Sequence, residues 1–149
     1  MSLELVDDHM CYVCGSDNDL GLRLRFEHPS PGLLRAKVVF SKHHQGFRGI
    51  THGGMVSMVL DEMMVNLAWK EGIPAVTAEL SVRLLKPVKI GETVLLEGRI
   101  KPLEAGKRAF SASAEAKDAQ GILLASATAV CVRIRPSGDQ GSSSLGAVV

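Results

Sequence analysis

One segment, Gly53–Lys70, decides which folds are open to this chain. It contains no proline and few β-branched residues, and Glu71–Pro74 follows it with a glycine and then a proline, which predicts one long helix that ends there. Its apolar side chains run almost all the way round the helix. Such a helix must be buried on most sides, so we expect a sheet to wrap round it.

The rest of the sequence predicts strands. Gly and Pro turn signals separate six segments of strand character, which are residues 20–28, 32–40, 75–88, 91–101, 106–118 and 121–135. In the third segment, Thr77 lies opposite a row of apolar residues on one face, formed by Val76, Ala78, Leu80, Val82 and Leu84. We predict an α+β fold in which a hairpin, one helix and a four-strand meander form an antiparallel sheet curled round the central helix.

Length and composition indicate a single-domain protein and argue against a secreted or nucleic-acid-binding one. A chain of 149 residues fits one domain, placed at residues 1–135, and the Gly- and Ser-rich residues 136–149 predict a disordered tail. A net charge of +1 gives no field that would indicate a nucleic acid or a membrane surface as a partner. The N-terminal residues lack the basic start and apolar run of a signal peptide. We expect a cytoplasmic protein with its three cysteines reduced.

Two adjacent carboxylates lie in the predicted helix and need separate interpretations. Asp61 and Glu62 point about 100° apart on a helix. Glu62 has Asn66 one turn later and Lys70 beyond it, which predicts a partly solvated surface charge. Asp61 has apolar neighbours and Ser57, so we expect it to be buried or in a cleft. Because burying an unpaired carboxylate is costly, Asp61 either has a structural donor or serves chemistry.

The sequence His52-Gly53-Gly54 opens the helix. The first backbone N–H groups of a helix have no intrahelical partner, and the macrodipole is positive at that end. Glycines also allow a ligand to come close. This helix start can therefore hold a developing oxyanion, although the three residues alone fit an ordinary helix start equally well.

Three residues near the N-terminus have side chains that can bind a metal. His9, Cys11 and Cys14 offer three zinc ligands, but a structural site needs four and no fourth is evident. Cys131 lies in an apolar strand and is expected in the core. We therefore predict no metal and no cofactor.

Taken together, the motifs of residues 9–135 resemble those of a hot-dog-fold acyl-CoA thioesterase of the phenylacetyl-CoA thioesterase type. The central motif is HGGMVSMVLD, in which the Asp follows the His by nine residues. It is preceded by Cys11-x-x-Cys14-Gly15-x-x-Asn18-x-x-Gly21-Leu22 and followed by LLKPVKIGE, a Gly106-Lys107-Arg108 turn and an Asp118-x-x-Gly121 turn. Each motif is weak alone, whereas their order and spacing together are specific.

The resemblance implies roles for four residues. Asp61 would be the catalytic carboxylate, acting as general base on water or as nucleophile. The Gly53 N–H would polarise the thioester carbonyl, and His52 would shape that turn. Thr77 would help to orient the water, although it also fits an ordinary strand residue. Some relatives carry Asn six residues before the His, where this chain has Gly46, with Gln45 beside it as a substitute.

The implied reaction is hydrolysis of an acyl-CoA to a free acid and CoA. Substrate would contact glycines of the helix start, an acyl pocket and basic side chains near turns that meet the nucleotide tail. The predicted substrate-binding residues are Gly54, Gln45, Met58, Arg83, Lys86, Pro87, Lys107 and Arg108. For each basic residue alone, a solvated surface charge is the favoured interpretation. The alternatives are a hot-dog module that binds acyl thioesters without cleaving them and a hot-dog hydratase.

The spacing of the motif also bears on assembly. Nine residues at about 1.5 Å each put His52 and Asp61 about 13 Å apart along one helix, too far to act on one thioester. We therefore expect a homodimer with two composite active sites. The resemblance implies the same arrangement, and often a dimer of such dimers, which is a homotetramer.

Overall fold

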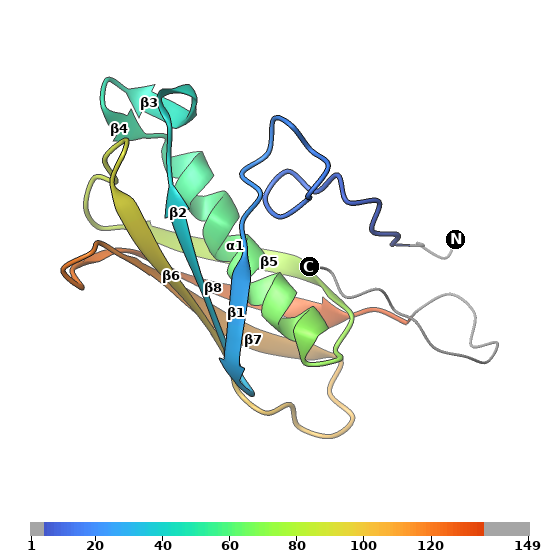
Figure 1. Ribbon diagram of the computed structural model, residues 1–149. Coiled ribbons are helices and arrows are strands. Elements are labelled where there is room, and N and C mark those ends of the chain that lie inside the picture. Colours follow the sequence, from blue (N-terminus) through green and yellow to red (C-terminus); the bar gives the residue numbers. More distant parts are fainter. Residues whose placement is uncertain (1–4, 136–149) are drawn as a thin grey trace.

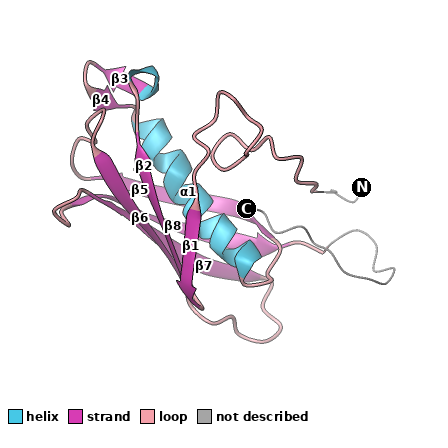
Figure 2. Cartoon of the chain, in the orientation of Figure 1, coloured by secondary structure: helices cyan, strands magenta, loops and turns pink. Residues whose placement is uncertain are grey.

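A computed structural model describes residues 5–135, and the predicted tail at 136–149 lies outside them. One helix, α1 (Gly53–Lys70), packs against a six-stranded antiparallel sheet (Figures 1 and 2). The strands of this sheet are β1 (Phe26–Ser30), β2 (Leu33–Val39), β5 (Ala75–Leu84), β6 (Thr93–Ile100), β7 (Ala109–Lys117) and β8 (Leu123–Arg133). The helix bounds agree with the prediction. The helix contacts the strands β2, β5, β6, β7 and β8 of this sheet.

The strand order differs from the predicted meander. Across the sheet the order is β1-β2-β6-β7-β8-β5, so of the four strands after the helix only β6, β7 and β8 follow one another as neighbours. The prediction of a four-strand meander was therefore wrong for β5, which pairs with β8 at the edge of the sheet. The reason is the helix, because α1 crosses the sheet and delivers the chain to the far edge (Figure 1).

The first strand begins later than predicted. Residues 20–25 alternate like a strand, yet their backbone bonds go elsewhere: the N–H groups of Leu22 and Leu24 donate to the carbonyls of Tyr12 and Val13. Arg23 adopts a φ of 50°, which breaks an extended chain. Residues 5–25, called here the N-terminal loop, therefore precede β1, and Val13 and Leu24 of this loop belong to the hydrophobic core.

The segment between β2 and α1 contains short elements that the sequence did not predict. These are a 3-10 turn, η1 (Lys42–His44), and a two-stranded sheet of β3 (Gln45–Phe47) and β4 (Ile50–Thr51). The Thr51 N–H donates to the Val88 carbonyl, which ties β4 to the β5–β6 connection. This small sheet fixes the position at which α1 begins.

Small side chains on the sheet let α1 lie close to it. Buried alanines of β7 and β8 face the helix at positions 112, 114, 116, 125, 127 and 129. On β6, a Cβ placed on Gly98 would lie 2.9 Å from the Met63 carbonyl oxygen. Larger residues of the helix fill this shallow surface, with Leu60, Met63 and Leu67 fully buried. The core is thus formed by large residues of α1 over small residues of the sheet.

A β-bulge in β5 changes which residues face the helix. Thr77 pairs with Cys131 and Glu79 with Val130, so Ala78 is an extra residue on β5. Cys131 is buried in the core, which places Thr77 on the helix side of the sheet. The prediction that Val76, Ala78, Leu80, Val82 and Leu84 share one face of the strand was therefore wrong for the residues that precede the bulge. An uninterrupted period of two would have pointed Thr77 away from α1.

Candidate active site

The first two backbone N–H groups of α1, those of Gly53 and Gly54, differ in their hydrogen bonding. His52 is the N-cap residue, and its Nδ1 accepts a hydrogen bond of 2.9 Å from the Gly54 N–H. The Gly53 N–H has no hydrogen-bond partner within residues 5–135. A donor at the positive end of a helix is suited to bind an oxyanion. His52 thus holds the turn, while Gly53 is the residue that offers a donor.

Side chains around this end limit what can approach it. A Cβ on Gly53 would lie 2.6 Å from Leu84 Cδ1, so the last residue of β5 covers the helix start. A Cβ on Gly46 would lie 3.3 Å from the Cα of His52, and the glycine therefore lets β3 pass close. Gln45 Oε1 accepts from the Gly49 N–H at 3.2 Å and so braces its own loop. The contact of Leu84 with the helix start was missed from the sequence, because it depends on β5 crossing to the sheet edge.

Asp61 lies near the middle of α1 and has a specific partner. Thr77 Oγ1 donates to Asp61 Oδ1 at 2.7 Å, and both residues are half-buried. No donor to Oδ2 is found among the described residues, which leaves that oxygen available to water. Burial and the neighbouring Asp61 carboxylate raise the pKa of the Cys131 thiol, so this cysteine stays protonated beside the site. The pair has the composition of a general base and a group that orients it.

The remaining predicted residues lie in separate places. Lys86 and Pro87 follow β5 near the start of α1, whereas Lys107 and Arg108 lie in the β6–β7 connection at the other end of the sheet (Figure 1). Arg83 pairs with Ser126, both on the side of the sheet away from α1. Met58 is half-buried on the helix between the two halves of the site. Within one chain, Asp61 contacts Thr77 and His52 contacts Gly54. The first pair does not contact the second.

The environment of Glu62 differs from the prediction of a surface charge. Its Oε1 accepts from the buried Asn66 amide, and the Cys11 thiol approaches the same oxygen at 3.8 Å. Burial raises the pKa of the Glu62 carboxyl above its ordinary 4.5, although a hydrogen bond from Cys14 opposes the shift. Burial and the Glu62 carboxylate also raise the pKa of the Cys14 thiol well above its ordinary value. In the sequence, the spacing of Glu62 and Asn66 and the pairing of Cys11 with Cys14 were separate signals, and nothing in it indicated that the two pairs meet.

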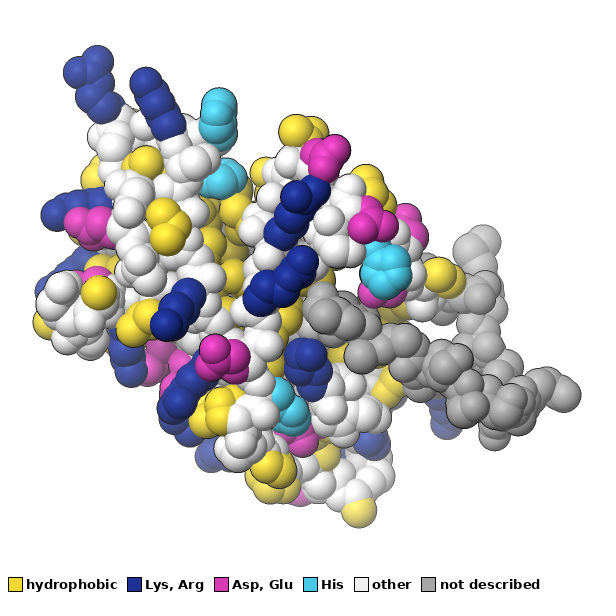
Figure 3. All heavy atoms as spheres, viewed as in Figure 1, with side chains coloured by type: hydrophobic (Ala, Val, Ile, Leu, Met, Phe, Trp, Pro, Cys, Tyr) yellow, Lys and Arg dark blue, Asp and Glu magenta, His cyan; other side chains and the backbone are white. Residues whose placement is uncertain are grey.

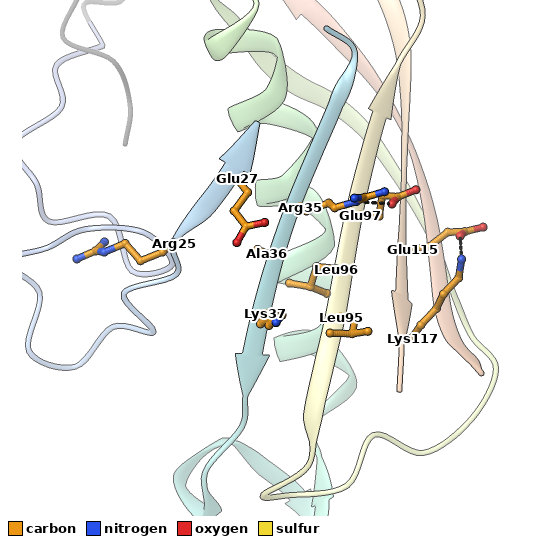
Figure 4. A pocket seen from close by; sticks show the side chains of 10 residues that line it. All are labelled: Arg25, Glu27, Arg35, Ala36, Lys37, Leu95, Leu96, Glu97, Glu115 and Lys117. Carbon is orange, nitrogen blue, oxygen red and sulfur yellow. Dashed lines mark hydrogen bonds and ion pairs between the residues drawn. The ribbon is translucent and has the colours of Figure 1, made fainter. Parts of the chain in front are cut away.

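A hollow on the outer face of β2, β6 and β7 contains none of the predicted site residues (Figure 4). Its charges are largely paired, with Arg35 Nε 3.0 Å from Glu97 and Lys117 Nζ 2.9 Å from Glu115. On the face seen in Figure 3, basic side chains are scattered among acidic ones and form no continuous patch. Within residues 5–135, no helix is long and apolar enough to cross a bilayer.

Comparisons with known proteins identify relatives of the chain. Acyl-coenzyme A thioesterase THEM4 of Mus musculus is 29% identical over 94 residues, which cover 63% of this chain and 40% of that protein. Acyl-coenzyme A thioesterase 13 of Homo sapiens is 26% identical over 99 residues, covering 64% of this chain and 69% of that protein. The alignment thus spans less than half the length of THEM4.

Solved structures show the same fold. The thioesterase superfamily protein RHA08564 superposes with a TM-score of 0.77 at 23% identity, covering 88% of this chain and 69% of its own. The PaaI protein of the E. coli phenylacetic acid degradation operon superposes with a TM-score of 0.70 at 17% identity, and the match covers 77% of this chain and 82% of that protein. A hypothetical thioesterase of Streptococcus pneumoniae with coenzyme A gives 0.69 at 16% identity, covering 77% and 88%. The predicted hot-dog fold is confirmed.

The family model of the thioesterase superfamily matches residues 48–125, which include the helix start, Asp61 and Thr77. This match covers more than half of the chain and runs through the helix and the strands that surround it. The chain therefore belongs to the thioesterase superfamily.

Proposed function

We propose that the protein hydrolyses an acyl-CoA thioester to a free acid and CoA. Asp61 acts as general base on water or as nucleophile, and the Gly53 N–H donates to the oxyanion. The observation that carries this proposal is the hydrogen bond that Thr77 Oγ1 donates to Asp61 Oδ1. It fixes the carboxylate in one orientation and leaves its second oxygen for the attacking group.

The reaction needs only groups that the chain supplies. In the general-base form, Asp61 takes a proton from water as the water oxygen bonds to the thioester carbon. The tetrahedral oxyanion is held by the Gly53 N–H, and the carbon–sulfur bond then breaks. The proton held by Asp61 passes to the departing CoA sulfur, so the carboxylate is restored.

The comparisons support this proposal at two points. The curated relatives bear the name acyl-coenzyme A thioesterase, and the S. pneumoniae protein was solved with coenzyme A. Two further structures of that protein carry alanine in place of an aspartate and of a threonine. These two residues are as far apart in that sequence as Asp61 and Thr77 are here, namely 16 positions. The same pair is thus the natural first target for mutation in this chain.

We infer further that the active site is shared between two chains. Thr77, near the start of β5, contacts Asp61, and Leu84, at the end of β5, covers Gly53. Strand β5 is an edge of the sheet, and its Leu80 and Leu84 are 39% and 55% exposed. Antiparallel pairing of two β5 strands about a two-fold axis would set Thr77 beside the partner's Leu84. That arrangement brings one chain's helix start toward the other chain's Asp61.

The substrate-binding assignments remain predictions. Lys86, Lys107 and Arg108 are exposed, as a role in meeting CoA phosphates requires, and such contacts are charge-assisted hydrogen bonds. Met58 and the loop before His52 are proposed to border the acyl group. Assembly beyond the dimer, into a homotetramer, and a cytoplasmic location likewise stay predictions from the sequence.

A panel of acyl-CoA substrates with a thiol reagent tests the activity. We expect CoA release from wild-type protein and a kcat loss of at least about 10²-fold in Asp61→Asn, which keeps the shape but removes the base. Asp19→Asn makes the same chemical change at a side chain that is 92% exposed, and should leave kcat unchanged. Binding of acyl-CoA without thiol release would instead favour a binding module, and hydration of an enoyl-CoA without thiol release would favour a hydratase.

A further inference from the structure

Two cysteines of the N-terminal loop and two residues of α1 meet outside the proposed active site. The Sγ atoms of Cys11 and Cys14 and a carboxylate oxygen of Glu62 all lie within 4.8 Å of one another. The Asn66 amide reaches the same place, with Nδ2 3.9 Å from Cys14 Sγ. The four residues come from segments that are about fifty positions apart in the chain, as the separation of 51 between Cys11 and Glu62 shows.

The local structure presents both thiols to the helix. The Gly15 N–H donates to the Cys11 carbonyl at 2.8 Å and closes a tight turn. A Cβ on Gly15 would lie 2.5 Å from the backbone N and O of Cys11, so only glycine fits there. On α1, Glu62 and Asn66 are one turn apart and share a face.

The polar atoms of this cluster lack the partners that a buried group requires. Among the described residues, Glu62 has the Asn66 amide and the thiols of Cys11 and Cys14 as hydrogen-bond partners, and none of these groups carries a positive charge. Asn66 is 1% exposed, and its Oδ1 has no hydrogen-bond partner within that part of the chain. An unpartnered oxygen and an uncompensated carboxylate at one buried position are together costly, and a cation would satisfy both.

We propose that Cys11, Cys14, Glu62 and Asn66 bind a zinc ion that fastens the N-terminal loop to α1. Thiolate sulfur, carboxylate oxygen and amide oxygen give a tetrahedral set of four donors. A half-turn of the Asn66 amide exchanges Oδ1 and Nδ2 and points the oxygen at the cluster. The two thiol protons pass to solvent when the metal binds.

Two of the ligand distances agree with this ion, whereas the Asn66 amide, whose Nδ2 lies 2.5 Å from Glu62 Oε1, must draw back when the metal binds. Bonds of about 2.3 Å to sulfur and about 2.1 Å to oxygen at the tetrahedral angle put the two ligand atoms about 3.6 Å apart. Cys11 Sγ and Glu62 Oε1 are 3.8 Å apart. His9, the third zinc ligand considered from the sequence, is exposed and lies beside Asp7, with Nδ1 3.7 Å from its Oδ2. In the proposed site, Glu62 and Asn66 of α1 are therefore the ligands in place of His9.

Cobalt is the probe that tests the site, because thiolate ligands give it a charge-transfer absorption and a tetrahedral set gives it strong visible bands. Protein freed of metal with a chelator and kept reduced should take up one Co²⁺ per chain with both features, and Zn²⁺ should remove them. Zinc should also raise the melting temperature. Cys11→Ser should abolish the charge transfer and the thermal shift, and Asn66→Leu should weaken binding at least about tenfold.

Matched variants keep the test decisive. Cys131→Ala removes the third cysteine and His9→Ala the nearby histidine, and neither should change the cobalt spectrum. Cys11 is only half-buried, so Cys11→Ser is usable even where the buried Cys14 does not tolerate change. Three results overturn the proposal: reduced protein that binds no stoichiometric metal, binding that survives Cys11→Ser, or binding that is lost in His9→Ala.

Discussion

At the scale of single residues, the contact between Thr77 and Asp61 connects the fold to the proposed chemistry. The hydroxyl reaches the carboxylate because an extra residue in β5, Ala78, turns Thr77 toward the helix. Thr77 is thus a positioning residue in this scheme. Its effect should appear in the orientation of the base rather than in substrate affinity.

Thr77→Val removes the hydroxyl and keeps the shape of the side chain. We expect kcat to fall about 10- to 100-fold with KM nearly unchanged, because a misplaced base slows the chemical step. Thr77→Ser retains the hydroxyl and should restore most of the activity. A comparable loss in both variants, with intact folding by circular dichroism, would show that the hydroxyl is not what matters.

At the scale of elements, Glu71 links the end of α1 to the turn between β1 and β2. Its Oε1 accepts from the Gly32 N–H at 2.6 Å and lies 2.8 Å from His28 Nε2. These bonds, the first above all, lower the pKa of the Glu71 carboxyl below its ordinary 4.5. A lowered pKa contributes stability that is present above the ordinary value and is lost as the pH falls through the folded-state value.

Glu71→Gln should therefore lower the free energy of unfolding by about 1 kcal/mol at neutral pH, with the difference shrinking as the pH falls below 4.5. Urea denaturation at a series of pH values measures it. Glu92→Gln, which removes the exposed partner of Lys89, is the control and should change stability by only a few tenths of a kcal/mol. An undiminished difference at low pH would contradict the assigned role of charge.

The close approach of β6 to α1 gives a second prediction for the elements. Gly98→Ala would place a methyl group 2.9 Å from the Met63 carbonyl oxygen, and neither backbone can move without disturbing the sheet. We expect a loss of about 1–3 kcal/mol in unfolding free energy, measured by urea denaturation. Gly121→Ala is a turn control whose Cβ would meet no atom within 4 Å, so that only its positive φ would cost stability. An unaffected Gly98→Ala protein would show that the helix sits higher on the sheet.

The elements also show what the sequence could predict. The helix bounds of Gly53 and Lys70 follow from local stop signals and composition, which act within a few residues. The side of the sheet on which Thr77 lies depends on a bulge, and the setting of Glu62 depends on Cys11, 51 positions away. Neither is encoded in a local pattern. The thioesterase motif singled out Asp61 and Gly53 as candidates, whereas the groups that surround them could be identified only from the fold.

At the scale of the whole molecule, a shared active site can be tested by mixing two inactive variants. Asp61→Asn lacks the base, and Gly53→Pro lacks the N–H donor at the first helical position, where proline is favoured and its Cβ displaces only the end of the Leu84 side chain. After subunit exchange, random pairing gives about half heterodimers, each with one intact site, and hence about a quarter of wild-type activity. Mass spectrometry of intact dimers confirms exchange. Exchange without recovery of activity would show that each chain completes its own site.

The placement of Thr77 and Leu84 near opposite ends of β5 has a consequence for how much enzyme a cell needs. In the proposed shared site, Thr77 orients the Asp61 base of one chain and Leu84 covers the Gly53 donor that serves the other, so a single chain is inactive until it pairs with a second copy. Rate then rises with the square of chain concentration when dimers are scarce, and linearly when they are abundant. Under the proposed function, low expression would leave acyl-CoA pools untouched, and a modest rise in synthesis would switch hydrolysis on steeply.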